Sequence, residues 1–163
     1  MLQRCYDEKA HKRQQSYIDC IVCEEWHNLS NFNRWYLENY YKIDGQRMEL
    51  DKDILVKGNR IYSPDTCVFV PQRINQLILG SDSIRGKFPI GVYYDRVKKR
   101  YIAHMHCAGR EIKLQQCKSP IEAFFVYKFY KESYIKAVAE DYKNKIPEKL
   151  YNALIAWEVE ITD

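Results

Sequence analysis

The chain has 163 residues, with 26 basic and 22 acidic side chains and a formal net charge of +4 at pH 7. Hydrophobic residues make up 46% of the chain, so it can bury the core of one domain or of two small ones. No apolar run is long enough to cross a membrane, and the polar start lacks the apolar core of a secretory signal, which predicts an intracellular, cytoplasmic protein with reduced cysteines.

The first part of the chain predicts short helices around a cysteine pair. Residues 1–19 are polar and predict a short helix and a loop. Cys20 and Cys23 then form a CxxC pair. From Ser30 onward aromatic residues repeat at helical spacing, which predicts an amphipathic helix.

Residues 48–75 predict a strand, a turn at Lys57-Gly58-Asn59, a second strand or loop, and a helix from Pro71. An acid at the end of the first strand, then a turn and a short helix, is the plan of a ββα metal site. Asp51 and Asp53 can hold Mg²⁺ together with water. The alternative is that both acids form an exposed turn before an apolar strand.

This half of the chain resembles the HNH endonuclease superfamily, in the version found in phage homing-endonuclease-like proteins. The resemblance rests on MLQRCY, on VCEEW with a following NF and W, on LDKDIL and on YSPDTCVFVPQRIN. It implies a metal-binding acid and a water-activating histidine at the strand end, and a closing Asn or His on the helix side. Here Asp51 stands at the metal position, Lys52 replaces the histidine and Thr66 falls at the closing position.

The resemblance therefore implies a degenerate catalytic set of Asp51, Lys52, Asp53 and Thr66, with cleavage impaired or absent, because lysine is a poor base unless its pKa is strongly lowered. The alternative is an active endonuclease that uses Mg²⁺ and a different base.

The cysteines give a second interpretation of the same region. The resembling phage proteins also carry cysteine at three of these positions, and the CxxC pair adds a fourth. Thiolates at such spacing can converge on one tetrahedral Zn²⁺, and structural zinc would stabilise a small core. The predicted ligands are Cys5, Cys20, Cys23 and Cys67, with His11 or His27 as replacements. The alternative is that these residues are buried, inert thiols.

Gly80 and the serines after it predict a helix stop and a short linker, with a domain boundary at 81–85. Three strands are predicted next, at 90–95, 101–107 and 111–114. The turn before the third strand carries Gly109, which permits a positive φ.

A long helix is predicted directly after the strands. Ser119 suits its N-cap, Pro120 its first position, and Glu122 completes a capping box. A further short helix is predicted from Pro147, followed by an acidic tail.

Basic residues are concentrated in the predicted sheet. Residues 85–118 carry nine Lys or Arg and two acids, a net charge of +7, so the rest of the chain sums to −3. Strand alternation places Val92, Ala103, Met105, Ile112 and Leu114 on the face that the helix covers.

The other face is left free for an anionic partner, and a β-ribbon of this kind fits the major groove of double-stranded DNA. The predicted DNA contacts are Arg85, Lys87, Tyr93, Arg96, Lys98, Lys99, Arg100, His104, His106, Arg110 and Lys113. The alternative is a solvated basic surface without a partner.

The same stretch resembles the AP-two type DNA-binding domain of plant ethylene-response factors, which also occurs in phage and mobile-element proteins. The matching residues are Gly91-Val92, Tyr101-Ile102-Ala103, Leu114, Glu122-Ala123 and Tyr127. The resemblance implies DNA binding by the exposed face of a three-stranded sheet. The family's glycine after the third strand is Gln115 here, and its usual phenylalanine before the helix is Cys117.

The predicted fold class is α+β: a small ββα, HNH-like module followed by a three-stranded antiparallel sheet packed on a long helix. The predicted domains are 1–80, 85–145 and 146–163. The predicted function is DNA binding in the host cell by a phage or mobile-element protein of homing-endonuclease descent.

Two other functions stay open, the active nuclease and a phage-encoded inhibitor of a host protein. A homodimer is also an open alternative, through apolar surface on the long helix. The aromatic residues that could form an inhibitor's surface are Trp35, Tyr36, Tyr130, Tyr134 and Trp157.

Overall fold

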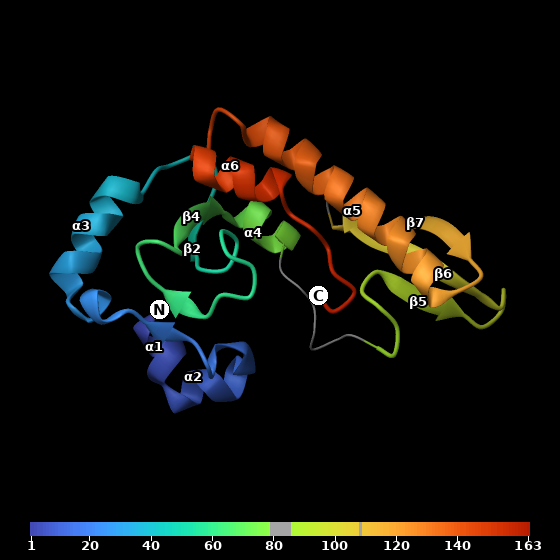
Figure 1. Ribbon diagram of the computed structural model, residues 1–163, viewed down its shortest axis with the longest axis horizontal. Coiled ribbons are helices and arrows are strands. Elements are labelled where there is room, and N and C mark those ends of the chain that lie inside the picture. Colours follow the sequence, from blue (N-terminus) through green and yellow to red (C-terminus); the bar gives the residue numbers. More distant parts are fainter. Residues whose placement is uncertain (79–85, 108) are drawn as a thin grey trace. The chain divides into compact units, whose positions relative to one another are not determined.

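The computed structural model describes residues 1–78, 86–107 and 109–163 and shows a mixed α+β protein (Figure 1). The chain forms two compact units. Unit 1 comprises residues 1–78 and 143–153, and unit 2 comprises residues 79–142 and 154–163. The boundary predicted at 81–85 lies outside the described residues.

Unit 1 contains two small sheets and short helices. The strand β1 (Ile21–Val22) pairs in parallel with β3 (Ile61–Tyr62), and β2 (Met48–Asp51) pairs antiparallel with β4 (Val68–Pro71). The helices at the start of the chain are α1 (Leu2–Tyr6), α2 (Glu8–Arg13) and α3 (Leu29–Asn39), with 3-10 turns at Gln15–Tyr17 and Glu24–His27. The helix α4 (Gln72–Ile78) follows β4 directly. The strand, the turn and the helix predicted over residues 48–75 are confirmed, except that the helix begins at Gln72 and Pro71 ends β4. The segment predicted as one further strand or loop contains two strands, β3 and β4.

The core of unit 1 is aromatic. The indole rings of Trp26 and Trp35 lie 4.7 Å apart between centroids, and Trp35 lies 5.5 Å from Phe69 on β4. The contact between Trp35 and Phe69 packs α3 against the strand β4, because each aromatic ring buries a large apolar surface. The α3 helix begins where Asn28 accepts a hydrogen bond from the Ser30 N–H, as an N-cap residue does.

Unit 2 is a three-stranded antiparallel sheet in the order β5-β6-β7, packed against one helix. Its elements are β5 (Val92–Asp95), β6 (Arg100–Cys107), β7 (Arg110–Cys117) and α5 (Pro120–Tyr142). The predicted three-stranded sheet on a long helix is confirmed. The third strand is longer than predicted, because its pairing with β6 continues to Cys117. A β-bulge at Leu114 shifts the register of this pairing between Ala103 and His104.

One face of this sheet packs against α5. Val92, Ala103 and Met105 are buried there with Ala123 and Tyr127 of the helix. The predicted covered face is confirmed for these strand residues; Leu114 is half-buried, whereas Ile112 is 43% exposed.

The start of α5 has the predicted cap. The Ser119 hydroxyl accepts the Glu122 N–H at 3.1 Å, and the Glu122 carboxylate accepts the Lys118 N–H at 2.9 Å. Gly91 has φ +72°, and a Cβ at this position would overlap the Tyr127 ring, so the close approach of β5 to α5 requires glycine.

The C-terminal residues are shared between the units. The helix α6 (Glu148–Ile155) starts after Pro147, as predicted. In unit 2, Val159 packs into the core of the sheet, and its backbone is held by Lys128 and Glu132 of α5 at 2.7 and 2.8 Å. Among the described residues, no helix combines the length and the apolar character needed to cross a bilayer.

Candidate functional site

The turn between β5 and β6 is fixed by Asp95. The Asp95 Oδ1 accepts the N–H groups of Val97 and Lys98, both at 3.0 Å, and the hydrogen bond from Lys98 lowers the pKa of this carboxyl. Lys99 adopts a positive φ of 52°, which closes the turn onto β6. The Asp95 hydrogen bonds and the positive φ of Lys99 therefore give this loop a defined conformation. We call its exposed cations the basic turn: Arg96, Lys98, Lys99 and Arg100.

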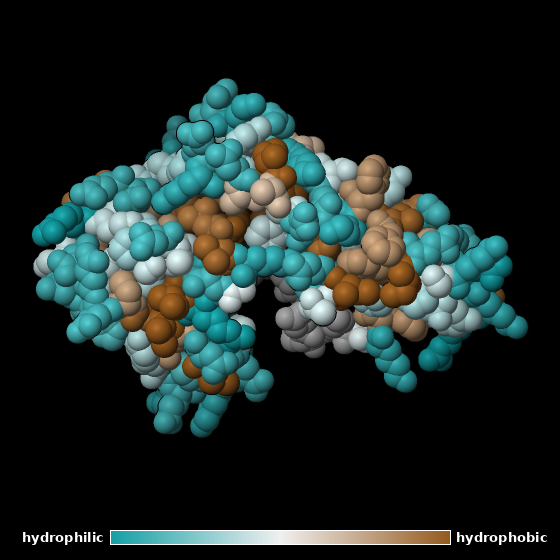
Figure 2. All heavy atoms as spheres, in the orientation of Figure 1, coloured by the Kyte–Doolittle hydropathy of each residue, from teal (hydrophilic) through white to brown (hydrophobic). Residues whose placement is uncertain are grey.

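Within the described part of the chain, no side chain of the basic turn is in an ion pair. Figure 2 shows hydrophilic side chains gathered at this end of the sheet. Lys118 belongs to the same end, because Cys117 just before it pairs with Tyr101. Arg110 lies at the opposite end of the sheet, where it pairs with Cys107.

Between these two ends, the face of the sheet away from α5 carries a connected row of side chains. The Tyr93 ring meets His104 edge-on at 5.0 Å between centroids, and His104 lies 6.0 Å from His106. The Lys113 Nζ lies 5.9 Å from the centre of the Tyr93 ring. Glu111 pairs with His106, and its Oε1 lies 3.0 Å from Nδ1 of His104. We call Tyr93, His104, His106, Glu111 and Lys113 the open-face row.

The row is electrostatically coupled. Burial lowers the pKa of His104, and the nearby carboxylate of Glu111 opposes this shift without reversing it. A hydrogen bond to Tyr93 raises the pKa of Lys113, so this lysine is charged throughout the physiological range. The row therefore presents an ammonium, two imidazoles, a phenol and one carboxylate on one surface.

Most residues predicted to contact DNA lie on this face or at the ends of the sheet, and their contact with DNA stays a prediction. Lys87 is exposed, whereas Arg85 lies outside the described residues. Ile102 shares the face of the row by register but is only 3% exposed, so the accessible surface is interrupted between Arg100 and His104.

Sequence reasoning missed Glu111 and Lys118 as members of the site. Strand alternation from Lys113 could have identified Glu111. Lys118 reaches the basic end because β7 continues past the predicted end at Leu114 to Cys117.

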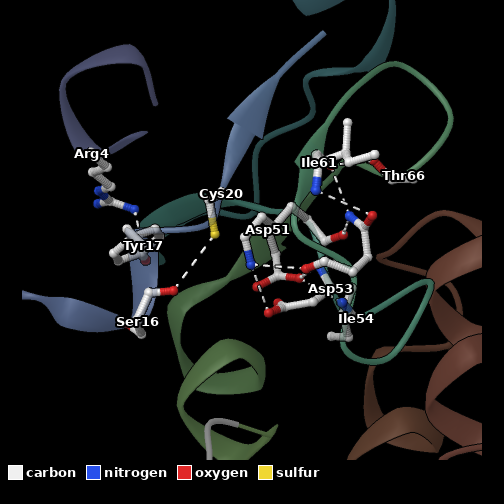
Figure 3. Close-up of polar contacts among 11 residues, drawn as sticks. Arg4, Ser16, Tyr17, Cys20, Asp51, Asp53, Ile54, Ile61 and Thr66 are labelled. Atoms are coloured by element: carbon white, nitrogen blue, oxygen red, sulfur yellow. Dashed lines mark hydrogen bonds and ion pairs between the residues drawn. The ribbon is translucent and has the colours of Figure 1, made fainter. Parts of the chain in front are cut away.

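Three of the predicted catalytic residues of unit 1, Asp51, Lys52 and Asp53, form a hydrogen-bonded cluster at the end of β2 (Figure 3). The Asp51 Oδ1 accepts the N–H groups of Asp53 and Ile54 at 2.9 and 2.7 Å. The Lys52 Nζ donates to Asp53 Oδ2 at 2.9 Å and to the Asn59 carbonyl at 3.2 Å. Asp51 is only 9% exposed, so the predicted alternative of an exposed turn is wrong for this acid, whereas the side chain of Asp53, the other acid of that prediction, is 43% exposed. Lys52 is 8% exposed.

Thr66 serves the loop that returns to β4. Its hydroxyl donates to the Ile61 carbonyl at 2.7 Å and lies 2.9 Å from the Ser63 hydroxyl. These contacts make Thr66 a turn-holding residue.

Burial and the neighbouring charges shift the pKa values of Asp51 and Lys52. Burial, and then the charge of Asp53, raise the pKa of Asp51 to about 6. Burial lowers the pKa of Lys52, but its hydrogen bond and attraction to Asp53 outweigh burial, so this pKa is raised overall. Lys52 is therefore a cation and not a general base in this arrangement.

The cluster does not fit a magnesium site as arranged. Oδ1 of Asp51 is occupied by two backbone donors, and the Lys52 ammonium takes the place beside Asp53 where a metal would neutralise charge. No three His, Cys, Asp or Glu side chains in residues 1–78, 86–107 and 109–163 are grouped so as to hold a metal ion.

The four cysteines predicted to bind zinc lie in or beside the aromatic core of unit 1. Cys5, Cys20 and Cys67 are buried there, and Cys23 is packed at its margin. Burial raises the pKa of the Cys5 thiol and raises that of Cys67 to about 12, which favours the thiol over the thiolate that zinc requires. The arrangement fits packed thiols, and zinc binding here stays a prediction for elemental analysis.

The predicted replacement ligands for zinc make other contacts. A His11 ring nitrogen lies 3.0 Å from the Cys5 carbonyl, and a His27 ring nitrogen lies 3.2 Å from the Val22 carbonyl.

Comparison with known proteins gives no match: no family model, no curated protein and no solved structure is similar to this chain. The function is therefore inferred from the chain's own geometry and charge.

Proposed function

We propose that this protein binds double-stranded DNA through the basic turn and the open-face row of unit 2. The main support for this proposal is the exposed charge of the basic turn. Four exposed cations project from a loop that Asp95 holds in place, and none of them forms an ion pair in the described part of the chain. Four cations beside one carboxylate, that of Asp95, leave a net positive charge that phosphate groups can neutralise.

The spacing of charge along the sheet supports the same partner. The strand β6 has eight residues, so the basic turn and Arg110 lie roughly 23 Å apart at about 3.3 Å per residue. The face between them carries hydrogen-bonding side chains rather than a second basic cluster. We assign the two ends to phosphates and the row between them to base edges in the major groove.

We further propose that the protein binds DNA without metal-dependent cleavage at Asp51, Lys52 and Asp53. The Lys52–Asp53 ion pair supports this proposal, because it supplies the positive charge that a catalytic metal would otherwise bring to these acids. The resemblance to HNH proteins is compatible with descent from a nuclease whose acids now serve the fold.

The binding proposal is tested by the triple variant Lys98→Ala, Lys99→Ala, Arg100→Ala in the full chain. A matched control removes three exposed cations from α2 of unit 1, with Lys9→Ala, Lys12→Ala, Arg13→Ala. Affinity for a random duplex is measured by fluorescence anisotropy over salt concentrations from about 50 to about 300 mM.

Losing three phosphate contacts should reduce affinity about 100-fold near physiological salt and should lower the salt slope by about 3. The control should keep the wild-type slope. Equal loss in both triple variants, or unchanged affinity in the first, would show that the basic turn is not the DNA-binding surface.

A further inference from the structure

A carboxylate, that of Glu111, lies beside Arg110 on a surface that otherwise suits an anionic polymer. Two acids lie on this face of the sheet. Asp95 stabilises the turn, where its Oδ1 accepts hydrogen bonds from two backbone N–H groups. Among the described residues, Glu111 receives no backbone hydrogen bond, and its side chain is 42% exposed. Glu111 thus has free acceptor capacity on the face proposed to meet DNA.

The position of Glu111 is fixed by its neighbours. Its Oε1 lies 3.0 Å from His104 Nδ1, while no donor in the described part of the chain contacts its Oε2, so this second oxygen can accept a hydrogen bond. His104 is itself held edge-on against Tyr93, and Tyr93 carries the Lys113 ammonium over its ring. The chain of contacts orients a carboxylate that would otherwise rotate freely.

A fixed carboxylate at this place weakens binding to every phosphate backbone, since it repels the polyanion. It becomes favourable only opposite a hydrogen-bond donor. In the major groove, the donors are the amino groups of cytosine and adenine, and adenine presents an acceptor beside its amino group that repels a carboxylate. Cytosine N4 is therefore the base atom that Glu111 fits best.

We propose that Glu111 determines sequence specificity by accepting a hydrogen bond from cytosine N4, an inference that rests on the proposed DNA-binding function. Lys113 follows two residues later on the same face of β7, about 7 Å along the strand. That is about two base-pair steps, so its ammonium reaches the O6 and N7 acceptors of a nearby guanine. The preferred site then contains a cytosine and a guanine at fixed spacing.

The test is selection of random duplexes by the full-length protein and by Glu111→Gln. The wild type should enrich a motif with cytosine at one fixed position. In the variant that position should lose cytosine or change to adenine, because a glutamine amide matches the donor and acceptor of adenine. Affinity for unselected duplex should rise about 5-fold, since one negative charge is gone from the face.

Glu38→Gln is the matched control, because it removes one exposed carboxylate from α3 in unit 1. It should change neither the motif nor the affinity. An identical motif from Glu111→Gln, or binding without any enriched motif in the wild type, would overturn the role of Glu111 while leaving DNA binding in place. A wild type that binds no duplex would instead overturn the proposed function.

Discussion

The two units use charged side chains in opposite ways. In unit 1, Asp51 and Lys52 are buried at the end of β2, where backbone N–H groups and Asp53 satisfy them. In unit 2, the basic turn and Lys113 point outward from a sheet whose other face is covered by α5. A run of charged residues in a sequence therefore does not show by itself whether it stabilises the fold or binds a partner. A structural cluster has its oppositely charged or hydrogen-bonding partners within the chain, whereas a binding surface does not.

The largest expected effect is a loss of stability confined to unit 2. Gly91→Ala should destabilise unit 2 by about 4 kcal/mol, because the new Cβ overlaps the Tyr127 ring and the residue must also keep φ at +72°. Gly109→Ala is the control, since Gly109 has φ +75° but open space around it, and should cost about 1 kcal/mol. Denaturant unfolding followed by circular dichroism measures both. Equal costs would show that the approach of Gly91 to Tyr127 contributes nothing.

Removing the Lys52–Asp53 ion pair of unit 1 should lower stability by less than Gly91→Ala does. Lys52→Met keeps the apolar length beside Tyr17 and Tyr62 but removes the charge, and should destabilise unit 1 by about 3 kcal/mol because two acids lose their cation. Trp26 and Trp35 report on this unit in a Trp157→Phe background. The exposed Lys12→Ala control should change stability by less than about 0.5 kcal/mol.

A gain in stability in Lys52→Met would contradict an internal role for this lysine. Binding of Mg²⁺ by this variant but not by the wild type, measured by calorimetry, would support the view that the ammonium stands in for a metal.

The smallest effect is a pH dependence at Asp51. Its pKa of about 6 lies above its ordinary value of 3.8, so the folded state holds this proton more tightly than the unfolded state. The contribution of Asp51 to stability is therefore most favourable below pH 4 and is lost as the pH rises through 6. Asp51→Asn removes that dependence while keeping an oxygen for the two N–H donors. We expect the variant to be about 2 kcal/mol more stable than the wild type at pH 7, and indistinguishable near pH 4. A wild type that gains stability between pH 4 and 6 relative to the variant would contradict the raised pKa.

Local patterns predicted much of the fold, and long-range packing accounts for what they missed. Ser119, Pro120 and Glu122 signal the start of α5 within a few residues, so the cap could be read directly. The bulge at Leu114 and the close approach at Gly91 depend on elements distant in the sequence, and neither leaves a local signature.

The candidate site shows the same division. Alternation placed Tyr93, His104 and Lys113 on one face correctly. The strand-end acid predicted a metal site, but the sequence could not show that the Lys52 side chain folds back onto Asp53.

The most direct measurement is a titration of the ¹⁵N-labelled protein with a short DNA duplex, followed residue by residue by NMR. We expect the amide shifts to concentrate at the basic turn, at Tyr93 and His104, and along Arg110–Lys113. The amide signals of residues 51–53 should stay unchanged. Shifts centred on residues 51–53, or no shifts in the sheet at duplex concentrations that saturate binding, would contradict it.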